Sequence, residues 1–340
     1  MNVKAVIRDW MLPIAMLTGA SIYLIYHFTP ALHPAGPFLS GLAGVMQPVL
    51  IFAMLFLTFC RIEPKDLKPH RWHWWLLLIQ GGLFTCLGMV AFLVMRHFPE
   101  KGHAYIVLIE SAMLCFICPT ATAAAVVTRK LGGDVAGITT YTILINLVTA
   151  VLVPVVVPLI RPVSGLDFWT AFSMIMAKIF PILIMPCLAA WMIRYMAPRL
   201  HRYLLSYPDL PFYLWSVGLA LAVAVTTRSI VNSEMGVMML VMIALVSLGC
   251  CVIQFALGRF VGNCYRPRRV TSYGSEAEAR GKALRKVTAG QSLGQKNTIF
   301  AIWMGYTFMT PETSIVGGLY SIWHNLYNSW QLYRAGRSEE

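Results

Sequence analysis

The chain has 340 residues, of which 58% are hydrophobic and 12% are charged, and its formal net charge is +13. Soluble domains carry about 25% charged residues, so this composition, with a mean hydropathy of +0.67, excludes an ordinary soluble protein. It predicts an all-α polytopic membrane protein. The positive charge does not indicate a nucleic-acid partner, because the basic residues lie in short segments between apolar runs, where they orient spans in the lipid bilayer.

Ten apolar runs follow one another along the chain, and each is long enough to cross a hydrocarbon core about 30 Å thick at about 1.5 Å per residue. We predict ten transmembrane helices over residues 11–29, 41–60, 72–95, 104–127, 135–160, 168–193, 211–231, 236–262, 287–309 and 312–332. The first run is too long for a cleaved signal peptide, so we expect it to remain as a span.

The 27 Lys and Arg residues are distributed unevenly about these spans. Twenty-one lie on the side that holds both termini, four lie on the other side, and Lys178 and Lys296 lie within spans. Cytoplasmic segments carry the excess of basic residues, so both termini are predicted to be cytoplasmic, in a cell membrane (the inner or plasma membrane). The longest basic segment, the cytoplasmic loop 261–286, is expected to be attracted to anionic lipid.

The ten spans divide into two halves of five, 1–160 and 168–332. An odd number of spans in each half gives the halves opposite orientations, as in transporters built from inverted repeats. The fourth span contains Pro119 and the ninth contains Gly294, each beside hydroxyl or carboxamide side chains. Proline and glycine interrupt helices, and interruptions at corresponding positions of two halves predict a binding site near the bilayer midplane.

Polar residues within the spans are the candidate site residues. Lys296 is the most informative, because a lysine near a span centre costs about 2.5–3.5 kcal/mol and requires water or a partner. The candidates for binding a substrate or an ion are Lys296, Gln295, Asn297, Thr298, Ser292, Gln291, Gln80, Thr120, Thr122, Thr142, Asn146 and Glu110. Gln80 and Asn146 are equally typical of interhelical hydrogen bonds. Glu110 is expected either near the outer interface or beside a lysine, and Lys178 either reaches the interface or binds carbonyls freed by a nearby proline.

The eight cysteines and eight histidines show no metal-binding pattern. Cys115 and Cys118 lie in an apolar run without further ligands, so we expect buried thiols that act as small apolar side chains. Most histidines lie in loops or at span ends, and only His324 is well within a span. Hydrolysis or acyl transfer requires paired carboxylates, a Ser–His pair or a His-ligated metal, so no enzyme, metal site or cofactor is predicted.

Two stretches together resemble the bile acid:sodium symporter family. The first is residues 118–128 (CPTATAAAVVT), followed by Gly133-Asp134-Val135-Ala136, and it is similar to the family's broken fourth helix and the turn into the fifth. The second is residues 294–298 (GQKNT), which resembles its broken ninth helix. The resemblance implies a panel of spans 1, 2, 6 and 7 and a core of spans 3, 4, 5, 8, 9 and 10. It also implies that the broken helices 4 and 9 cross at their breaks.

At the sodium sites the chain departs from the sodium-coupled members that it resembles. It has Ala124 and Ala125 where they place a Ser-Asn pair, and Ser292 where they place a glutamate. Ile138 stands near one of their hydroxyl ligands, while Thr142 keeps the next. Alanine and isoleucine supply no side-chain oxygen to a hard cation, so the resemblance implies a divergent branch with degraded sodium sites.

Lys296 stands where the family has a neutral glutamine, and Gln80 resembles the glutamine that the family uses in its third span. An ammonium held by Gln80, Gln291 or the carbonyls of a broken helix would do the electrostatic work of a bound sodium ion. A buried lysine can also exchange its proton. We therefore hypothesise that Lys296 is either a surrogate cation or a proton carrier.

These features favour a secondary active transporter of a small organic anion that works by alternating access, with Na⁺ or H⁺ as the possible coupling ion and without the usual sodium coupling. The N-terminal ends of half-helices attract anions. One alternative is a receptor or regulator that binds a ligand on the same fold without transporting it. A cation/proton antiporter is another alternative, but it needs intramembrane aspartates, and Asp134, Asp167 and Asp209 all lie in loops.

Overall fold

The computed structural model describes residues 11–98, 102–162, 165–207, 209–265 and 275–336. In these ranges the secondary structure is helical, with long α-helices and two short 3₁₀ helices. Four basic residues at predicted loops or termini, Lys4, Arg8, Lys101 and Arg337, lie outside the described residues, as do residues 266–274 of the predicted loop 261–286. The prediction of a loop was wrong for most of the remaining residues, because one helix continues to Cys264 and the next begins at Ser275. The helices are α2 (Met11–Phe28), η1 (Pro30–Ala35), α3 (Gly36–Cys60), η2 (Pro64–Asp66), α4 (Arg71–His97), α5 (Gly102–Ile117), α6 (Ala124–Lys130), α7 (Val135–Ile160), α8 (Phe168–Leu183), α9 (Met185–Met196), α10 (Pro198–Leu205), α11 (Leu210–Val231), α12 (Val237–Cys264), α13 (Ser275–Gly294), α14 (Thr298–Phe308) and α15 (Pro311–Gly336).

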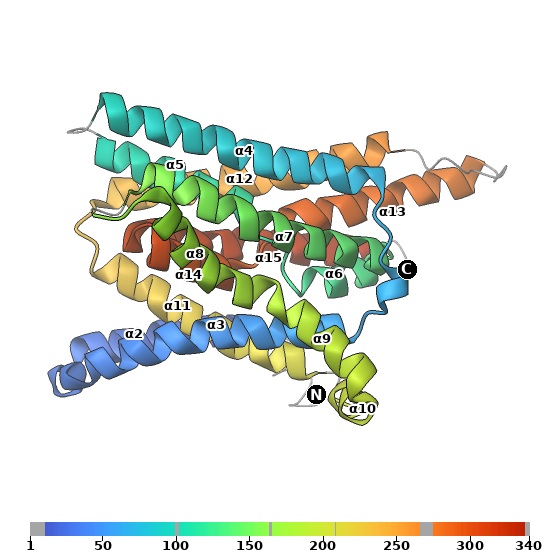
Figure 1. Cartoon of the computed structure of the whole chain (residues 1–340), viewed down its shortest axis with the longest axis horizontal. Helices are drawn as coiled ribbons and strands as arrows, with labels where there is room; N and C mark the ends of the chain where they lie inside the picture. Colours follow the sequence, from blue (N-terminus) through green and yellow to red (C-terminus); the bar gives the residue numbers. More distant parts are fainter. Residues whose placement is uncertain (1–10, 99–101, 163–164, 208, 266–274, 337–340) are drawn as a thin grey trace.

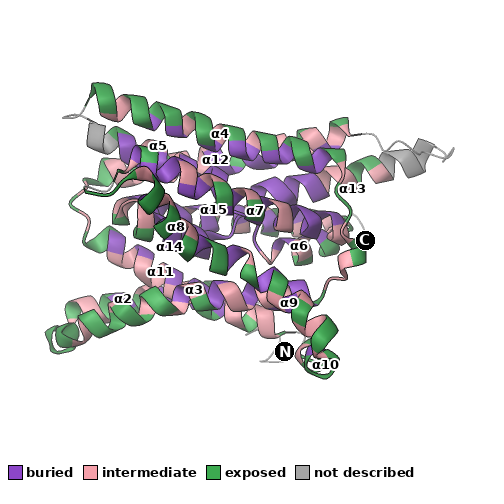
Figure 2. Ribbon diagram, in the orientation of Figure 1, coloured by how far each residue is buried: buried purple, intermediate pink, exposed green. Residues whose placement is uncertain are grey.

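The helices form two groups in space (Figure 1). Helices α2, α3 and α11 pack against one another at the bottom of the view, with α9 beside α3. Helices α4, α5, α7, α12, α13 and α15 form the larger upper group, and α8 runs from this group toward the lower one. Burial is concentrated in the interior of the molecule, where most of α7 and the first eight residues of α14 are buried (Figure 2).

Among the described residues, five helical segments are long and apolar enough to cross a membrane, and the chain is therefore a multi-pass membrane protein. They are Pro30–Cys60, Arg71–His97, Val135–Ile160, Leu210–Val231 and Val237–Cys264. The pair α8 and α9, bent by 41° at its break, makes a sixth when counted as one span. Three of the remaining predicted spans correspond to shorter or interrupted helices, namely α2, α5–α6 and α13–α14. The fourth, α15, is continuous and long enough to span a membrane, but it contains too many polar residues to be identified by hydropathy.

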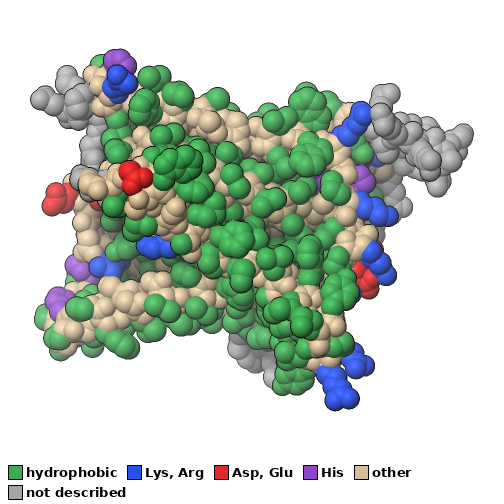
Figure 3. All heavy atoms as spheres, viewed as in Figure 1, with side chains coloured by type: hydrophobic (Ala, Val, Ile, Leu, Met, Phe, Trp, Pro, Cys, Tyr) green, Lys and Arg blue, Asp and Glu red, His purple; other side chains and the backbone are tan. Residues whose placement is uncertain are grey.

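The surface supports the membrane assignment. Hydrophobic side chains cover the middle of the face seen in Figure 3, while Lys and Arg side chains gather toward its two ends. Many large apolar residues are exposed along the helices, among them Phe38, Trp169 and Val237. A soluble protein rarely exposes such a continuous apolar surface, whereas lipid tails would cover it.

Both helix interruptions predicted from the sequence are present. Helix α5 ends at Ile117 and α6 begins at Ala124, while α13 ends at Gly294 and α14 begins at Thr298. A third interruption, at Ile184 between α8 and α9, was not predicted from the sequence. Prolines at 181 and 186 flank it, and each removes a backbone N–H that a continuous helix needs.

Candidate functional site

The two broken helices cross at their breaks and are joined there by backbone hydrogen bonds. Residues Thr120 and Lys296 pair as an isolated antiparallel bridge. The Ala121 N–H donates to the Gln295 carbonyl at 3.0 Å, and the Asn297 N–H donates to the Pro119 carbonyl at 2.8 Å. Non-helical backbone within a membrane is tolerated only where its polar groups are satisfied. Each break therefore supplies hydrogen-bond partners to the other.

The C-terminal end of α5 leaves backbone carbonyls that no further helical turn satisfies. Side chains from other elements bond to these carbonyls. The amide of Gln254 on α12 donates to the Cys115 carbonyl at 3.1 Å, and the Thr149 hydroxyl on α7 donates to the Ile117 carbonyl at 2.9 Å. Two further elements bond to the same helix end, namely α4 through Gln80 and the second break through Lys296. Together with α12 and α7, four elements therefore converge on the end of α5.

The Lys296 side chain reaches into this helix end. Its ammonium donates to the Phe116 carbonyl at 3.3 Å, and the residue is only 1% exposed. The carboxyl end of a helix carries a partial negative charge that favours a cation. No ion pair joins Lys296 to any residue in the described part of the chain. A lysine ammonium has three N–H donors, so this buried charge is only partly satisfied by the protein.

Gln80 also supports the broken fourth span, from α4. Its amide nitrogen donates to the Cys118 carbonyl at 3.0 Å and approaches the Ile117 carbonyl at 3.4 Å. Its amide oxygen accepts from the Tyr141 hydroxyl at 2.8 Å. The amide of Gln80 therefore bonds to the break of the fourth span, and the ammonium of Lys296 bonds to a carbonyl two residues earlier in the chain.

Residues around the second break are placed by similar contacts. Asn297 caps α14, since its side-chain oxygen accepts from the Phe300 N–H at 3.2 Å. The Thr120 hydroxyl donates to the Ser292 carbonyl at 2.6 Å, and the Ser292 hydroxyl donates to Thr288 within its own helix. Gln295 and Thr298 are buried at the same crossing. These residues, with Lys296 and Gln80, are the predicted candidates that the structure brings together.

Other candidates lie near the crossing but face different partners. The Gln291 amide nitrogen donates to Asn328 of α15 at 2.9 Å, and its amide oxygen has no partner, so Gln291 does not hold the ammonium. The Thr142 hydroxyl donates to Ile138 of its own helix. Asn146 is buried, and neither its amide nitrogen nor its amide oxygen has a partner. The side chain of Thr122 is half-buried between the two halves of the fourth span.

Glu110 belongs to a separate cluster. Its carboxylate accepts two hydrogen bonds from Arg161, at 2.6 and 3.1 Å, and one from the Thr313 hydroxyl at 3.0 Å. This cluster joins α5, the end of α7 and the start of α15, away from the Lys296 ammonium. The structure therefore pairs Glu110 with an arginine and not with either intramembrane lysine. Lys178 is exposed, with its ammonium 5.7 Å from the centre of the Phe308 ring.

Sequence reasoning missed several residues that support the crossing. The Tyr320 hydroxyl donates to the Gly294 carbonyl at 2.8 Å and accepts from Gln254 at 3.1 Å. The Cys118 thiol donates to the Asn297 carbonyl at 2.8 Å. A signal was present for Gln254, which is a carboxamide in the largely apolar α12. Tyr320 gave no comparable signal, because α15 contains many polar residues. Within the described ranges, no group of three His, Cys, Asp or Glu side chains is arranged to hold a metal ion.

Comparison with known proteins identifies the family. The model of the Sodium Bile acid symporter family matches residues 48–255, more than half of the chain. The chain belongs to this family. No curated protein matches it. Membership in the Sodium Bile acid symporter family makes the chain a membrane transporter of the symporter type. The match includes the break between α5 and α6 but ends before α13, so it covers only one of the two crossing helices.

Proposed function

We propose that the chain is a secondary active transporter of small organic anions, and that Lys296 takes the place of a sodium ion at its centre. The observation that carries this proposal is the buried ammonium of Lys296, which has one carbonyl partner and no acidic partner among the described residues. An isolated buried charge costs several kcal/mol. An anionic substrate that reaches the crossing would offset this cost, and exchange of the proton would do so as well.

The side chains around the crossing support coupling without sodium. Sodium is a hard cation that requires several oxygen ligands. Ala124, Ala125 and Ile138 have no side-chain oxygen, and the hydroxyls of Ser292 and Thr142 bond within their own helices. The substrate is proposed to be a carboxylate or sulfonate, because the N-terminal end of α14 lies at the same crossing and favours negative charge.

We further propose ten spans in two inverted repeats, 1–160 and 168–332. The five long spans and the bent pair α8–α9 are joined by α2, by the broken pairs α5–α6 and α13–α14, and by α15. In this scheme α2, α3, α8–α9 and α11 form the panel, and the remaining helices form the core. Both termini are cytoplasmic in an inner or plasma membrane. Alternating access arises when the core moves against the panel.

The proposal is tested first by finding a ligand. Purified protein in detergent is heated with a panel of carboxylates, sulfonates and sulfate conjugates, and an increase in Tm identifies a binder. The binder is then used in labelled form for counterflow in proteoliposomes, with sodium and pH gradients varied separately. We expect counterflow that does not require sodium. Strict sodium dependence would contradict the proposal, and binding without counterflow would indicate a receptor on this fold.

Two lysine variants separate a site role from a general charge effect. Lys296→Met removes the ammonium and keeps a side chain of similar length, and we expect it to abolish binding of the anion. Lys178→Met is the matched control, because Lys178 is also intramembrane but exposed. We expect the control to keep wild-type binding. A Lys296→Met protein that folds and binds the anion with unchanged affinity would remove the basis of the proposal.

A further inference from the structure

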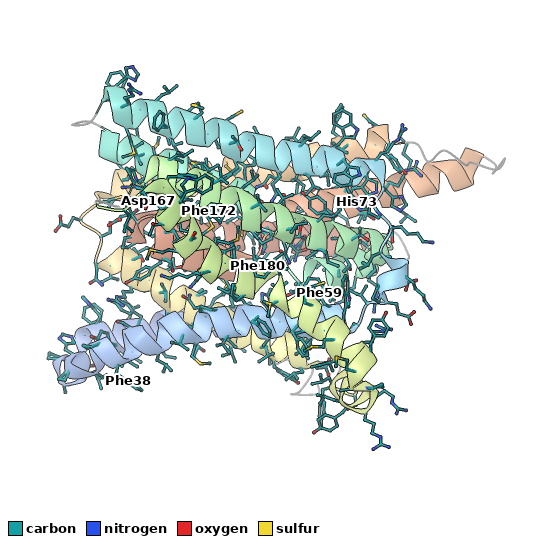
Figure 4. All side chains as sticks on the ribbon, in the orientation of Figure 1. Phe38, Phe59, His73, Asp167, Phe172 and Phe180 are labelled. Atoms are coloured by element: carbon teal, nitrogen blue, oxygen red, sulfur yellow. The ribbon has the colours of Figure 1, made fainter. Side chains whose placement is uncertain are left out.

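A cavity lies at one end of the core, apart from the crossing. It has a volume of about 280 Å³ and is lined by the start of α4, the turn between α6 and α7, the end of α12 and a segment of α13. Figure 4 places this end of α4, marked by His73, opposite the end of the molecule that carries Asp167. By the distribution of basic residues this is the cytoplasmic end.

The walls of the cavity are held close together by glycine. Gly132 adopts φ +75°, which favours glycine. A Cβ at Gly262 would lie 2.5 Å from the Arg285 carbonyl, and a Cβ at Gly133 would lie 2.9 Å from the Thr288 hydroxyl. The Thr288 hydroxyl also accepts from the Asp134 N–H at 2.9 Å. Helix α13 is therefore fastened to the turn between α6 and α7 beside the cavity.

Two opposite charges line the cavity without pairing to each other or to any other described residue. The guanidinium of Arg285 includes a buried Nε with no hydrogen-bond partner. The carboxylate of Asp134 uses one oxygen to cap α7, by accepting from the Gly137 N–H at 3.0 Å. Buried donors without partners are rare in folded proteins and call for a ligand or water. The cavity thus offers a cationic donor and an anionic acceptor at the same time.

The remaining walls and the depth of the cavity limit the ligand further. Trp72, Tyr265 and Leu284 supply apolar and aromatic surface. The cavity lies where α4 and α7 begin and α12 ends, which is the level of lipid headgroups for helices of these lengths. Its volume equals that of about nine water molecules at about 30 Å³ each, which accommodates a small headgroup without acyl chains.

We propose that this cavity binds a zwitterion composed of a phosphate and a primary ammonium, of the ethanolamine phosphate type. The phosphate bonds to Arg285, because guanidinium matches phosphate geometry. The ammonium donates to the free oxygen of Asp134. The bound zwitterion joins α13 to the turn after α6, so it fastens the cytoplasmic halves of both broken spans to each other. This site is independent of the proposed transport of organic anions.

The test uses short-chain lipids added to the purified protein in detergent, with unfolding followed by a thiol-reactive dye. The probes are dihexanoyl phosphatidylethanolamine, the matching phosphatidylcholine and the matching phosphatidylglycerol. We expect a saturable increase in Tm with the ethanolamine lipid alone. Choline cannot donate to Asp134, and glycerol carries no cation. Equal shifts with the ethanolamine and choline lipids, a larger shift with the glycerol lipid, or no shift with any of the three would overturn the proposal.

Two variants and one control complete the test. Arg285→Gln and Asp134→Asn are each expected to raise the half-saturating concentration of the ethanolamine lipid at least tenfold. Asp134→Asn keeps an acceptor for the α7 cap, so it should fold, and Arg285→Gln removes no cap. Lys282→Gln is the control, because Lys282 is exposed on the same helix, and it should bind as wild type. Unchanged binding by Arg285→Gln would refute the site.

Free O-phosphoethanolamine tests whether the bound zwitterion is a lipid headgroup or a soluble compound, because both carry the same phosphate and ammonium groups. A saturable shift with this soluble compound, lost in Arg285→Gln, would assign a cytosolic zwitterion as a sufficient ligand. A shift with the lipid but not with the soluble compound would assign the bilayer as the source, because the acyl chains then contribute to binding.

Discussion

The Glu110–Arg161 pair allows a quantitative test of what Glu110 does. The carboxylate of Glu110 is 1% exposed and the side chain of Arg161 is 27% exposed. Their burial is therefore unequal, and so are the expected costs of removing each partner. Removing one member of a buried pair costs about 3–5 kcal/mol when the charge that remains is buried, and much less when that charge reaches water.

We expect Arg161→Met to lower the free energy of unfolding by about 3 kcal/mol, because Glu110 then keeps only the Thr313 hydroxyl. Glu110→Gln should cost about 1 kcal/mol, since Arg161 can turn to solvent and the new amide still accepts from Thr313. The double variant should cost about 1–2 kcal/mol, less than Arg161→Met alone, because neither charge is left unpaired. The coupling energy in this cycle is then about 2–3 kcal/mol.

Six buried native cysteines make a thiol-reactive dye a suitable reporter of unfolding in detergent. The predicted order of Tm is wild type, Glu110→Gln, the double variant and Arg161→Met, with several degrees between the first and the last. If Glu110→Gln lowered Tm more than Arg161→Met, or if the two effects were additive, the pair would not stabilise the fold as a buried ion pair. If the double variant lost ligand binding while its Tm stayed unchanged, Glu110 would have a role in binding the ligand.

Further predictions concern packing, topology and pH. Gly294→Ala would place a Cβ against the ring of Phe255 and should cost about 1–3 kcal/mol, whereas a Cβ at Gly249 meets nothing within 4 Å, so Gly249→Ala should be neutral or stabilising in a thermal melt. An impermeant maleimide should label exposed Cys264 in inside-out vesicles and not in right-side-out vesicles; the opposite result would invert the topology. The hydrogen bond from the Thr170 hydroxyl lowers the pKa of Asp167 below its ordinary range, so this carboxylate stabilises the fold above about pH 4 and loses that effect as pH falls through its lower folded-state pKa. Asp167→Asn should therefore flatten the decrease of Tm between pH 5 and pH 3, and an unchanged slope would contradict this.

The sequence predicted the elements whose cause is local. Pro119 lies beside two threonines, and Gly294 is followed by three polar residues. Because each break combines a helix-disrupting residue with polar neighbours, both could be located without a structure. The break at Ile184 also has local causes, but proline within a span often produces only a bend, and the continuous α7 contains two prolines. The sequence could not predict that the Lys296 ammonium bonds to the Phe116 carbonyl, because this contact joins residues 180 positions apart.

The roles of polar residues were harder to predict than the helix breaks, because their partners are far away in the sequence. Glu110 and Arg161 are 51 residues apart, and only the packing of α5 against the end of α7 makes them a pair. Gln254 and Tyr320 each look like an isolated interhelical contact in the sequence. Their importance arises from convergence on the same helix end, which requires the tertiary structure.

The convergence on α5 also restricts how the protein can move. Side chains of α4, α7, α12 and the second break each satisfy a different carbonyl at the end of α5. Moving any one of these elements alone would expose a polar group where neither water nor lipid satisfies it, at a cost of about 1–3 kcal/mol per bond. These helices should therefore move as one body. A movement that opens the proposed site on either side must take place at the contacts of this body with α3, α8 and α11, where the boundary passes between helix faces and breaks no bond at the crossing.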